Sequence, residues 1–586
     1  RDHDGILRRR MEHAVDGDYQ YYSVSPGDIQ RELWVENNPY LADMMNSLTD
    51  AEIHDIKRGG QDPKKIYAAF AAAAATTDKP TVVLVKTVKG DGMMTVQGTN
   101  TVHQKKNLNP DERIACARAF GIPLSEAEMA RAAFYRPPED SEEIQYLKSH
   151  RERLGGYLPA RSVDCPALDA PPIERFAELL KDSGERTLST TTAAVRLISR
   201  LLKDKDIGRY IVPIVPDEAR TFGMDALFNV AGIYSPEGQK YKPVDDDSLL
   251  RYKEASDGQL LQEGICETGA MASFLAAGTA YAMHGIPTIP FYLFYSIFGF
   301  QRVGDMIWAC GDIMCRGFLL GGTAGRTTLN GEGLQHQDGH SQVVANTVPN
   351  LKSYDPAFAY ELAVIVRDGI ERMYTRDEKI FYYITLYNET YAMPALPEED
   401  VTAAIVAGLY RLRAAGPAPD KPRRRVHLLA SGAIMQQALA AAAVLEEYGC
   451  AVDIWSVTRF NELYRDALAC ERWNRLNPAA PPRRSHVETL LQDETGVFVG
   501  VSDYMKAYSE SISKWVPGPF VTLGTDGFGL SESRESLREY FEIDAGHIAL
   551  AALDALRATG EATIEDAQDL IRRYDIDGAK SNPAGA

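Results

Sequence analysis

Two carboxylates stand close together in the segment LLQEGICETGAMASFLAAG, residues 260–278, where Glu263 and Glu267 are four residues apart. Small and apolar residues dominate this segment, which predicts a helix packed on several sides with both carboxylates on one face. Like charges at this spacing repel by roughly 0.2–0.5 kcal/mol in water. A buried carboxylate without a partner is far more costly, or it takes up a proton. At least one of the two acids therefore needs a partner or a catalytic task.

A glycine-rich segment, GGTAGRTTLNGEGLQHQDGH (residues 321–340), is the second place where chemically active residues gather. It follows an apolar run directly, and such loops at the carboxyl ends of parallel strands bind ligands in α/β proteins. Because His336 follows Glu332 by four residues, a short helical turn would pair them. A surface loop with solvated histidines, including His340, is the alternative. No third ligand lies at zinc spacing, so no metal site is predicted.

Two further segments carry candidate binding residues. Asp217 and Glu218 come just after a predicted strand, at the ligand-binding end, although acids there also serve as helix N-caps. The segment FYLFYSIFGFQR (291–302) holds six aromatic residues, for which packing in the core is the default interpretation. Phe298 and Phe300 adjoin the turn formers Ser296 and Gly299. They therefore offer an alternative role, as a platform for a flat heterocycle.

Composition narrows the functional class. The 586 residues indicate three or four domains of about 150 residues each. A net charge of −19 argues against nucleic-acid and anionic-membrane surfaces, which need a basic patch. Seven scattered cysteines without a CxxC pair fit a reducing cytosol and so predict a cytoplasmic protein. No apolar run of about 18 residues predicts a membrane span, and the polar start is not typical of a signal peptide. A first residue of Arg rather than Met indicates a fragment or a processed product.

The chain alternates between predicted helices and strands. Residues 62–77 predict a helix, and the β-branched run PTVVLVKTV (80–88) predicts a buried strand. Residues 89–111 are polar and rich in Gly, Asn and Thr, which indicates a long mobile loop.

A second α/β unit begins at 190–204, with predicted strands at 209–216, 287–295 and 317–322. A third unit reads strand, helix, strand in RRRVHLLASG, AIMQQALAAAAVLEEYG and AVDIWSV. That order implies a parallel sheet, because the connecting helix has to cross over it.

Several motifs together resemble one family. They are VDGDYQ, GGQDPKKIYAAF, PDEARTFGM, QEGICETGA, FYLFYSIFGFQRVGD, GGTAGRTTLNGEGLQHQDGH, ERMY and LGTDGFGLSESRESLREYFE. In this order they are similar to the homodimeric bacterial pyruvate dehydrogenases, the decarboxylating components of the pyruvate dehydrogenase complex. The resemblance implies a transketolase-like α/β fold of three doubly wound domains with mostly parallel sheets, the first of them incomplete.

The resemblance also implies a division of the chain. Residues 1–110 would form the C-terminal part of a diphosphate-binding domain with a mobile active-site loop at 90–108, and 111–185 a helical connector. Residues 186–398 would form a pyrimidine-binding domain, and 399–586 a C-terminal transketolase-like α/β domain.

In this family the second acid of the opening segment, here Glu267, hydrogen-bonds a pyrimidine nitrogen of thiamin diphosphate and shuttles a proton. The resemblance implies further roles, residue by residue. The implied catalytic residues are Glu267, His336, His103 and Glu218. The implied cofactor-binding residues are Glu267, Phe298, Asp217 and Tyr295. The implied substrate residues are Lys89, His336, Glu332 and Tyr295. His103, on the mobile loop, would serve acetyl transfer to a lipoyl group.

The resemblance places the ligands of magnesium and of the diphosphate upstream of residue 1, and none in this chain. A protein beginning at Arg1 is therefore expected to bind thiamin diphosphate weakly, because the diphosphate would lie without its countercharge beside a chain of net charge −19.

The resemblance implies a thiamin-diphosphate-dependent 2-oxoacid dehydrogenase component that acts on pyruvate as a homodimer and passes acetyl groups to a lipoyl-bearing dihydrolipoyl acetyltransferase. One alternative is the same chemistry on 2-oxobutyrate, since one methylene changes binding by only ~1–3 kcal/mol. A second alternative, from another class, is a non-catalytic assembly subunit that lacks the metal half of the site.

Overall fold

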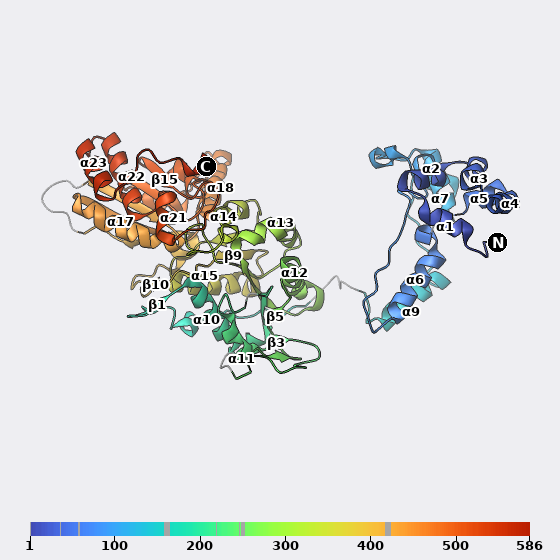
Figure 1. Cartoon of the computed structure of the whole chain (residues 1–586), viewed down its shortest axis with the longest axis horizontal. Helices are drawn as coiled ribbons and strands as arrows, with labels where there is room; N and C mark the ends of the chain where they lie inside the picture. Colours follow the sequence, from blue (N-terminus) through green and yellow to red (C-terminus); the bar gives the residue numbers. More distant parts are fainter. Residues whose placement is uncertain are drawn as a thin grey trace. The chain divides into compact units, whose positions relative to one another are not determined.

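The chain forms two compact units, Arg1–Tyr157 and Leu158–Ala586, in a computed structural model (Figure 1). The structure describes residues 2–35, 37–56, 59–157, 164–217, 219–244, 246–247, 252–416 and 424–585. None of the helices in these ranges carries an apolar stretch long enough to cross a membrane.

Five short helices open the first unit and share one small apolar cluster. They are α1 (Ile6–His13), α2 (Asp16–Val24), α3 (Gly27–Val35), α4 (Pro39–Asn46) and α5 (Asp50–His54). Trp34 lies in the middle of this cluster and is 1% exposed. The helix starts follow from local sequence, because Asn38 caps α4 and Thr49 forms a capping box with Glu52 at α5.

The predicted helix at 62–77 is present as α6 (Pro63–Ala75), with Asp62 as its N-cap. The buried strand predicted at 80–88 is wrong. Residues 81–88 pair with no other strand among the described residues, and Val82 and Leu84 are 82% and 92% exposed. An isolated strand leaves its backbone groups unpaired, so a β-branched run becomes a strand only where a neighbour can bond it.

The predicted loop at 89–111 contains two 3₁₀ turns, η2 (Met94–Val96) and η3 (Asn100–Gln104). It lies against α2, since the amide of Gln20 donates to the carbonyl of Gly98 at 2.5 Å and to the side chain of Asn100 at 3.1 Å. Three helices follow in the first unit: α7 (Pro110–Ala119), α8 (Glu126–Ala130) and α9 (Glu142–Arg153). The mobility predicted for the loop at 89–111 stays a prediction.

A six-stranded sheet forms the first half of the second unit, in the order β5-β2-β6-β7-β9-β8. The strands are β2 (Ile211–Val215), β5 (Leu261–Gln262), β6 (Ile289–Tyr295), β7 (Phe318–Gly322), β8 (Leu351–Tyr354) and β9 (Phe381–Thr385). Every neighbouring pair is parallel. The three strands predicted in this region are confirmed, because apolar runs buried on both faces are typical of central parallel strands.

Four long helices accompany this sheet: α10 (Thr190–Leu202), α12 (Glu267–His284), α13 (Ser296–Asp312) and α15 (Ala359–Ile370). The helix α12 packs on both β6 and α13. Its start therefore lies close to the carboxyl end of β6, where α13 begins.

The last part of the chain forms a five-stranded sheet in the order β11-β13-β12-β14-β15. The strands are β11 (Leu409–Arg413), β12 (Arg424–Ala430), β13 (Cys450–Val457), β14 (Val497–Val501) and β15 (Phe520–Leu523). Only the edge strand β11 is antiparallel to its neighbour. Helices α17 (Met435–Glu447) and α22 (Ala545–Ala558) lie side by side along this sheet (Figure 1). The predicted strand, helix and strand are present as β12, α17 and β13.

The division of the chain into two compact units falls between residues 157 and 158, inside the stretch 111–185 that was predicted to be one connector. The predicted domain boundaries stay predictions.

The apolar run of strand β6 and the apolar run at residues 81–88 lead to opposite predictions about the free energy of unfolding. Leu293 in β6 is fully buried, whereas Leu84 is 92% exposed. Leu293→Ala is expected to cost about 2–5 kcal/mol of unfolding free energy, because it leaves a cavity. The matched change Leu84→Ala is expected to stay within about 0.5 kcal/mol. Urea denaturation measures both. A large loss for Leu84→Ala would show that residues 81–88 are buried in the protein in solution.

Candidate active site

Glu267 is the first residue of α12 and is buried. Its carboxylate accepts a hydrogen bond at 2.5 Å from the guanidinium of Arg302, and its backbone carbonyl accepts one at 3.2 Å from the hydroxyl of Tyr292. The buried acid thus has a cationic partner, which offsets its desolvation.

Glu263 lies outside the helix, which corrects the prediction that both acids share one helical face. Gly264 adopts a left-handed conformation with φ of 87°, and α12 begins only at Glu267. The carboxylate of Glu263 accepts a hydrogen bond from the hydroxyl of Ser273. The two acids therefore have separate partners and do not repel each other along one helix face.

Arg302 joins Glu267 to the aromatic segment. It lies on α13, one turn after Phe298, and its guanidinium carbon is 3.8 Å from the centre of the Phe298 ring. Stacking of a flat cation on a ring is favourable, and it adds to the ion pair with Glu267. The sequence analysis missed Arg302, although its i,i+4 spacing from Phe298 was a usable signal.

Three rings gather beside this arginine. Tyr295 and His336 are stacked with ring centres 4.8 Å apart, and Phe298 meets both edge-on, at 5.6 Å from Tyr295 and 5.7 Å from His336. Phe300 does not join them, because it packs on Tyr383 in the core. The platform suggested for two phenylalanines therefore consists of Phe298 alone.

His336 reaches this cluster from the glycine-rich segment, where it ends the 3₁₀ turn η7 (Leu334–His336). Its Nδ1 lies 3.5 Å from a carboxylate oxygen of Glu332. That nitrogen is buried and forms no hydrogen bond within the described residues. A buried polar atom without a partner costs free energy. The nitrogen is thus suited to a polar group that enters from outside the chain.

Of the other candidates, Asp217 follows β2 and accepts a hydrogen bond at 2.9 Å from the amide of Gln262. Glu218 lies outside the described residues. Lys89 and His103 belong to the first unit, where the Lys89 amine is 2.9 Å from Nδ1 of His103. These two residues line a cavity of about 360 Å³ together with Asp16.

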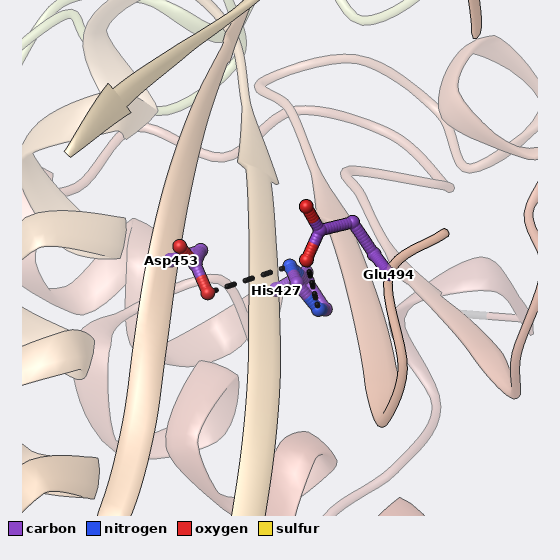
Figure 2. A group of neighbouring side chains, drawn as sticks. All are labelled: His427, Asp453 and Glu494. Atoms are coloured by element: carbon purple, nitrogen blue, oxygen red, sulfur yellow. Dashed lines mark ion pairs between the residues drawn. The ribbon is translucent and has the colours of Figure 1, made fainter. Parts of the chain in front are cut away.

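A second group of ligand-type side chains lies in the C-terminal sheet (Figure 2). His427 on β12 stands between Asp453 on β13 and Glu494. Its Nδ1 lies 3.8 Å from the carboxylate of Asp453, and its Nε2 lies 3.8 Å from that of Glu494. A metal would need a free nitrogen lone pair. However, Nδ1 accepts a hydrogen bond from the indole of Trp455 at 3.2 Å, and Nε2 lies 3.0 Å from the carbonyl of Thr495.

The position of a cation in this group is already filled by arginine. The guanidinium of Arg425 is 2.9 Å from Asp453 and 3.6 Å from Glu494, and Arg411 also pairs with both acids. Burial lowers the pKa of His427, so the imidazole is neutral and the two arginines balance the two carboxylates. The group is an ion-pair network that holds three strands together.

Three family descriptions match successive parts of the chain: "Transketolase, thiamine diphosphate binding domain" at residues 42–139, "Pyruvate dehydrogenase E1 component middle domain" at 164–394, and "Transketolase-like TK C-terminal domain" at 408–544. Proteins named pyruvate dehydrogenase E1 component are similar over the whole chain. That of Pseudomonas aeruginosa is 47% identical and that of Escherichia coli 46%.

The chain belongs to the pyruvate dehydrogenase E1 family. It covers 66% of the length of the Pseudomonas protein and 65% of that of the Escherichia protein. Transketolase structures share the fold at 16% identity. That of Pichia stipitis has a TM-score of 0.56 over 86% of this chain and 66% of its own. That of Campylobacter jejuni has a TM-score of 0.54 over 83% of this chain and 65% of its own. The predicted transketolase-like α/β class is thereby confirmed.

The ion-pair network around His427 makes a prediction about stability. Arg425→Met is expected to cost about 1–3 kcal/mol, because it leaves Asp453 buried with weakened compensation. Arg413→Met is the matched control. The Arg413 pair with Glu446 is similarly short, at 2.8 Å against 2.9 Å, and the arginine is similarly exposed, but Glu446 is 46% exposed whereas Asp453 is 1% exposed. That change is expected to cost about 0–1 kcal/mol. Urea denaturation compares the two, and equal losses would contradict the reading of a buried network.

Proposed function

We propose that this chain is part of an enzyme that decarboxylates pyruvate with thiamine diphosphate and transfers the acetyl group to a lipoyl group of an acetyltransferase. The observation that carries the proposal is the arrangement of Glu267, Arg302 and Phe298 beside the stacked pair of Tyr295 and His336. A buried acid, a flat ring face and a histidine are there combined at the carboxyl end of a parallel sheet. Ligands of α/β proteins bind at such an edge.

The described residues fit the aminopyrimidine half of the cofactor. One face of Phe298 already holds a flat, delocalised group, the guanidinium of Arg302 at 3.8 Å. Glu267 offers a buried carboxyl group for a ring nitrogen, and Nδ1 of His336 is buried and has no hydrogen bond from any residue that the structure describes. Thiamine diphosphate, when bound, supplies the nucleophilic carbon and the electron sink for the loss of carbon dioxide.

The residues of this chain would act by binding, orientation and proton transfer. Glu267 would hold and move a proton at the pyrimidine nitrogen, and Phe298 would fix the plane of the ring. His336, with Glu332 beside it, would hydrogen-bond the substrate-derived group, while Tyr295 keeps the imidazole in place by stacking. Asp217 and Glu218 are proposed to line the same pocket, as the family resemblance implies.

Magnesium and a dimer complete the proposal. Magnesium is proposed to accompany the diphosphate, since it usually bridges phosphate oxygens and a few protein ligands. The one three-ligand group found in the described residues, that of His427, is closed by arginine and is not proposed to hold it. A homodimer is supported by exposed apolar side chains on and next to helices α12 and α13. Trp308 on α13 is 52% exposed, and Ile313, Met314 and Ile265 are also exposed. Such exposed apolar groups are typical of contact surfaces. A cytoplasmic location stays a prediction.

Glu267→Gln tests the proposal, with Glu263→Gln as the matched control four residues away. In the full-length protein, Glu267→Gln is expected to lower the rate of pyruvate decarboxylation by roughly 10²–10⁴-fold while the fold persists, because an amide cannot shuttle the proton. Glu263→Gln, whose partner is Ser273, is expected to change the rate by only a few-fold. Steady-state assays with an artificial electron acceptor measure both.

Near-wild-type decarboxylation by Glu267→Gln would overturn the assigned role. A full-length wild-type protein without any decarboxylation would support the alternative of a non-catalytic assembly subunit. Comparison of the rates with pyruvate and with 2-oxobutyrate decides the substrate.

His103 is proposed to act in the second half-reaction. His103→Ala is expected to leave decarboxylation largely intact and to slow acetylation of a lipoyl domain by roughly 10-fold or more, because a loop residue acts when the second substrate docks. His150→Ala, a change of a histidine on α9, is the control. Equal losses in both assays would assign His103 to the first step or to structure.

A further inference from the structure

The glycine-rich segment that carries Glu332 and His336 is held by the C-terminal domain along most of its length. Main-chain and side-chain hydrogen bonds link it to residues between 503 and 534. The pairs are Arg326 with Thr525 and Gly527, Thr327 and Thr328 with Asp503, Asn330 and Thr328 with Arg534, Gly331 with Glu532, Glu332 with Ser531, Gln337 with Leu530, and Gly339 with Met505. The loop conformation therefore depends on a domain that supplies no residue to the predicted site.

Asp503 is fully buried, and it forms hydrogen bonds with three groups of the loop. It follows the carboxyl end of β14, and its carboxyl oxygens lie 3.0 Å from the backbone nitrogen of Thr327, 2.9 Å from the Thr327 hydroxyl and 3.0 Å from the Thr328 hydroxyl. Gly325 lets the loop come this close. A Cβ atom there would stand 2.2 Å from the carboxyl group of Asp503.

Both carboxyl oxygens of Asp503 accept hydrogen bonds from the loop. The backbone nitrogen of Thr327 lies 3.0 Å from one oxygen and 3.2 Å from the other. The Thr327 hydroxyl donates to the first oxygen and the Thr328 hydroxyl to the second. Thr328 shares its one proton between Asp503 and the carbonyl of Ala324, at 2.5 Å.

The surroundings of Asp503 agree with a neutral acid. Burial raises the pKa of Asp503 to about 7, while Arg538 and the two threonines act to lower it. The other charged or titratable groups that face it are Arg326, in the loop itself, and Tyr387. Arg538 is itself paired with Glu389, and Arg326 donates to backbone carbonyls, so neither cation is dedicated to Asp503.

We propose that Asp503 is a positioning residue, which fixes the loop of Glu332 and His336 through the hydrogen bonds that its buried carboxyl group accepts from Thr327 and Thr328. The term positioning rests on the proposed function, whereas the contact itself does not. In the folded protein the acid holds its proton up to a pKa of about 7, and in the unfolded chain up to 3.8. The fold therefore loses stability as the pH rises between these values, because ionisation leaves a buried charge at Asp503.

Hydrogen–deuterium exchange of residues 323–340 in the full-length protein tests the proposal without relying on activity. In the wild type, protection of the loop, corrected for intrinsic rates, is expected to fall by about 10-fold between about pH 6 and pH 8. Asp503→Asn replaces the acid by a group that still donates and accepts, so it is expected to keep the protection and to remove the pH dependence. Asp503→Ala is expected to lose protection at both pH values.

Two further variants keep the test decisive. Thr328→Val retains the acid but removes one of its hydrogen-bond donors, and it is expected to lower protection at about pH 6. Asp355→Asn neutralises another buried acid of the same unit, whose partners are Thr385, Tyr387 and Ser431, and it is expected to leave the pH response of the loop unchanged. Wild-type exchange that is independent of pH, or equal exchange in Asp503→Asn and Asp503→Ala, would overturn the proposal.

Decarboxylation kinetics separate this inference from the proposed function. If Asp503 positions His336, Asp503→Ala is expected to lower kcat by about 10-fold or more, and Asp503→Asn is expected to restore it. Exchange data as expected, together with no decarboxylation in the wild type, would keep the contact and overturn the proposed function.

Discussion

The second unit depends on buried carboxyl groups that receive hydrogen bonds across the junction of its two sheets. Glu361, at the start of α15, accepts bonds from the backbone nitrogens of Ala357 and Phe358 and from the hydroxyls of Tyr410 and Ser456. Burial raises the pKa of this carboxyl group. An acid in such a place is tolerated only when its oxygens are satisfied, so it fixes which residues meet at the junction. Apolar packing alone specifies less, since many arrangements of similar volume are nearly equivalent.

The same principle explains how the site is assembled. Strands β6 and β7 are apolar and buried, and they end side by side in the parallel sheet. Their carboxyl ends place the start of α13 and the glycine-rich segment next to each other, which brings Phe298 to His336. The segment has no regular structure of its own beyond η7, so contacts from the C-terminal domain replace the bonds that a helix or strand would supply. A site on a loop becomes rigid in this way only if the partner domain is rigid.

The sequence predicted the parts of this arrangement that have a local signal. Buried apolar runs identified the strands at 287–295 and 317–322, and the glycines together with two histidines identified the loop between 321 and 340. The run at 80–88 has the same local signal, yet it is no strand, because pairing requires a neighbour that local sequence cannot supply. Glu263 was placed on a helix because the positive φ of Gly264 has no periodic signature.

Contacts between distant residues account for what remained hidden. Asp503 bonds residues about 176 positions away in the chain, and Glu267 bonds Arg302 at a separation of 35. Sequence spacing alone identifies neither of these two pairings. The one local signal is the i,i+4 step from Phe298 to Arg302, which places the arginine beside the ring but does not identify Glu267 as its partner.

The pair of Glu267 and Arg302 is unequal in its exposure, and this inequality suits a binding site. The carboxylate side chain is 9% exposed, whereas the arginine side chain is 47% exposed. Arg302 can therefore exchange Glu267 for water at small cost, because a half-exposed ion pair contributes little. Glu267 cannot do the same, since a buried carboxylate without a partner is strongly disfavoured. The buried acid consequently needs a replacement donor whenever Arg302 leaves. A flat ring could stack on the face of Phe298 that Arg302 vacates, while its protonated nitrogen donates a hydrogen bond to Glu267. Such a ring would replace Arg302 at both residues at once, so release of the arginine is tied to occupation of the proposed site.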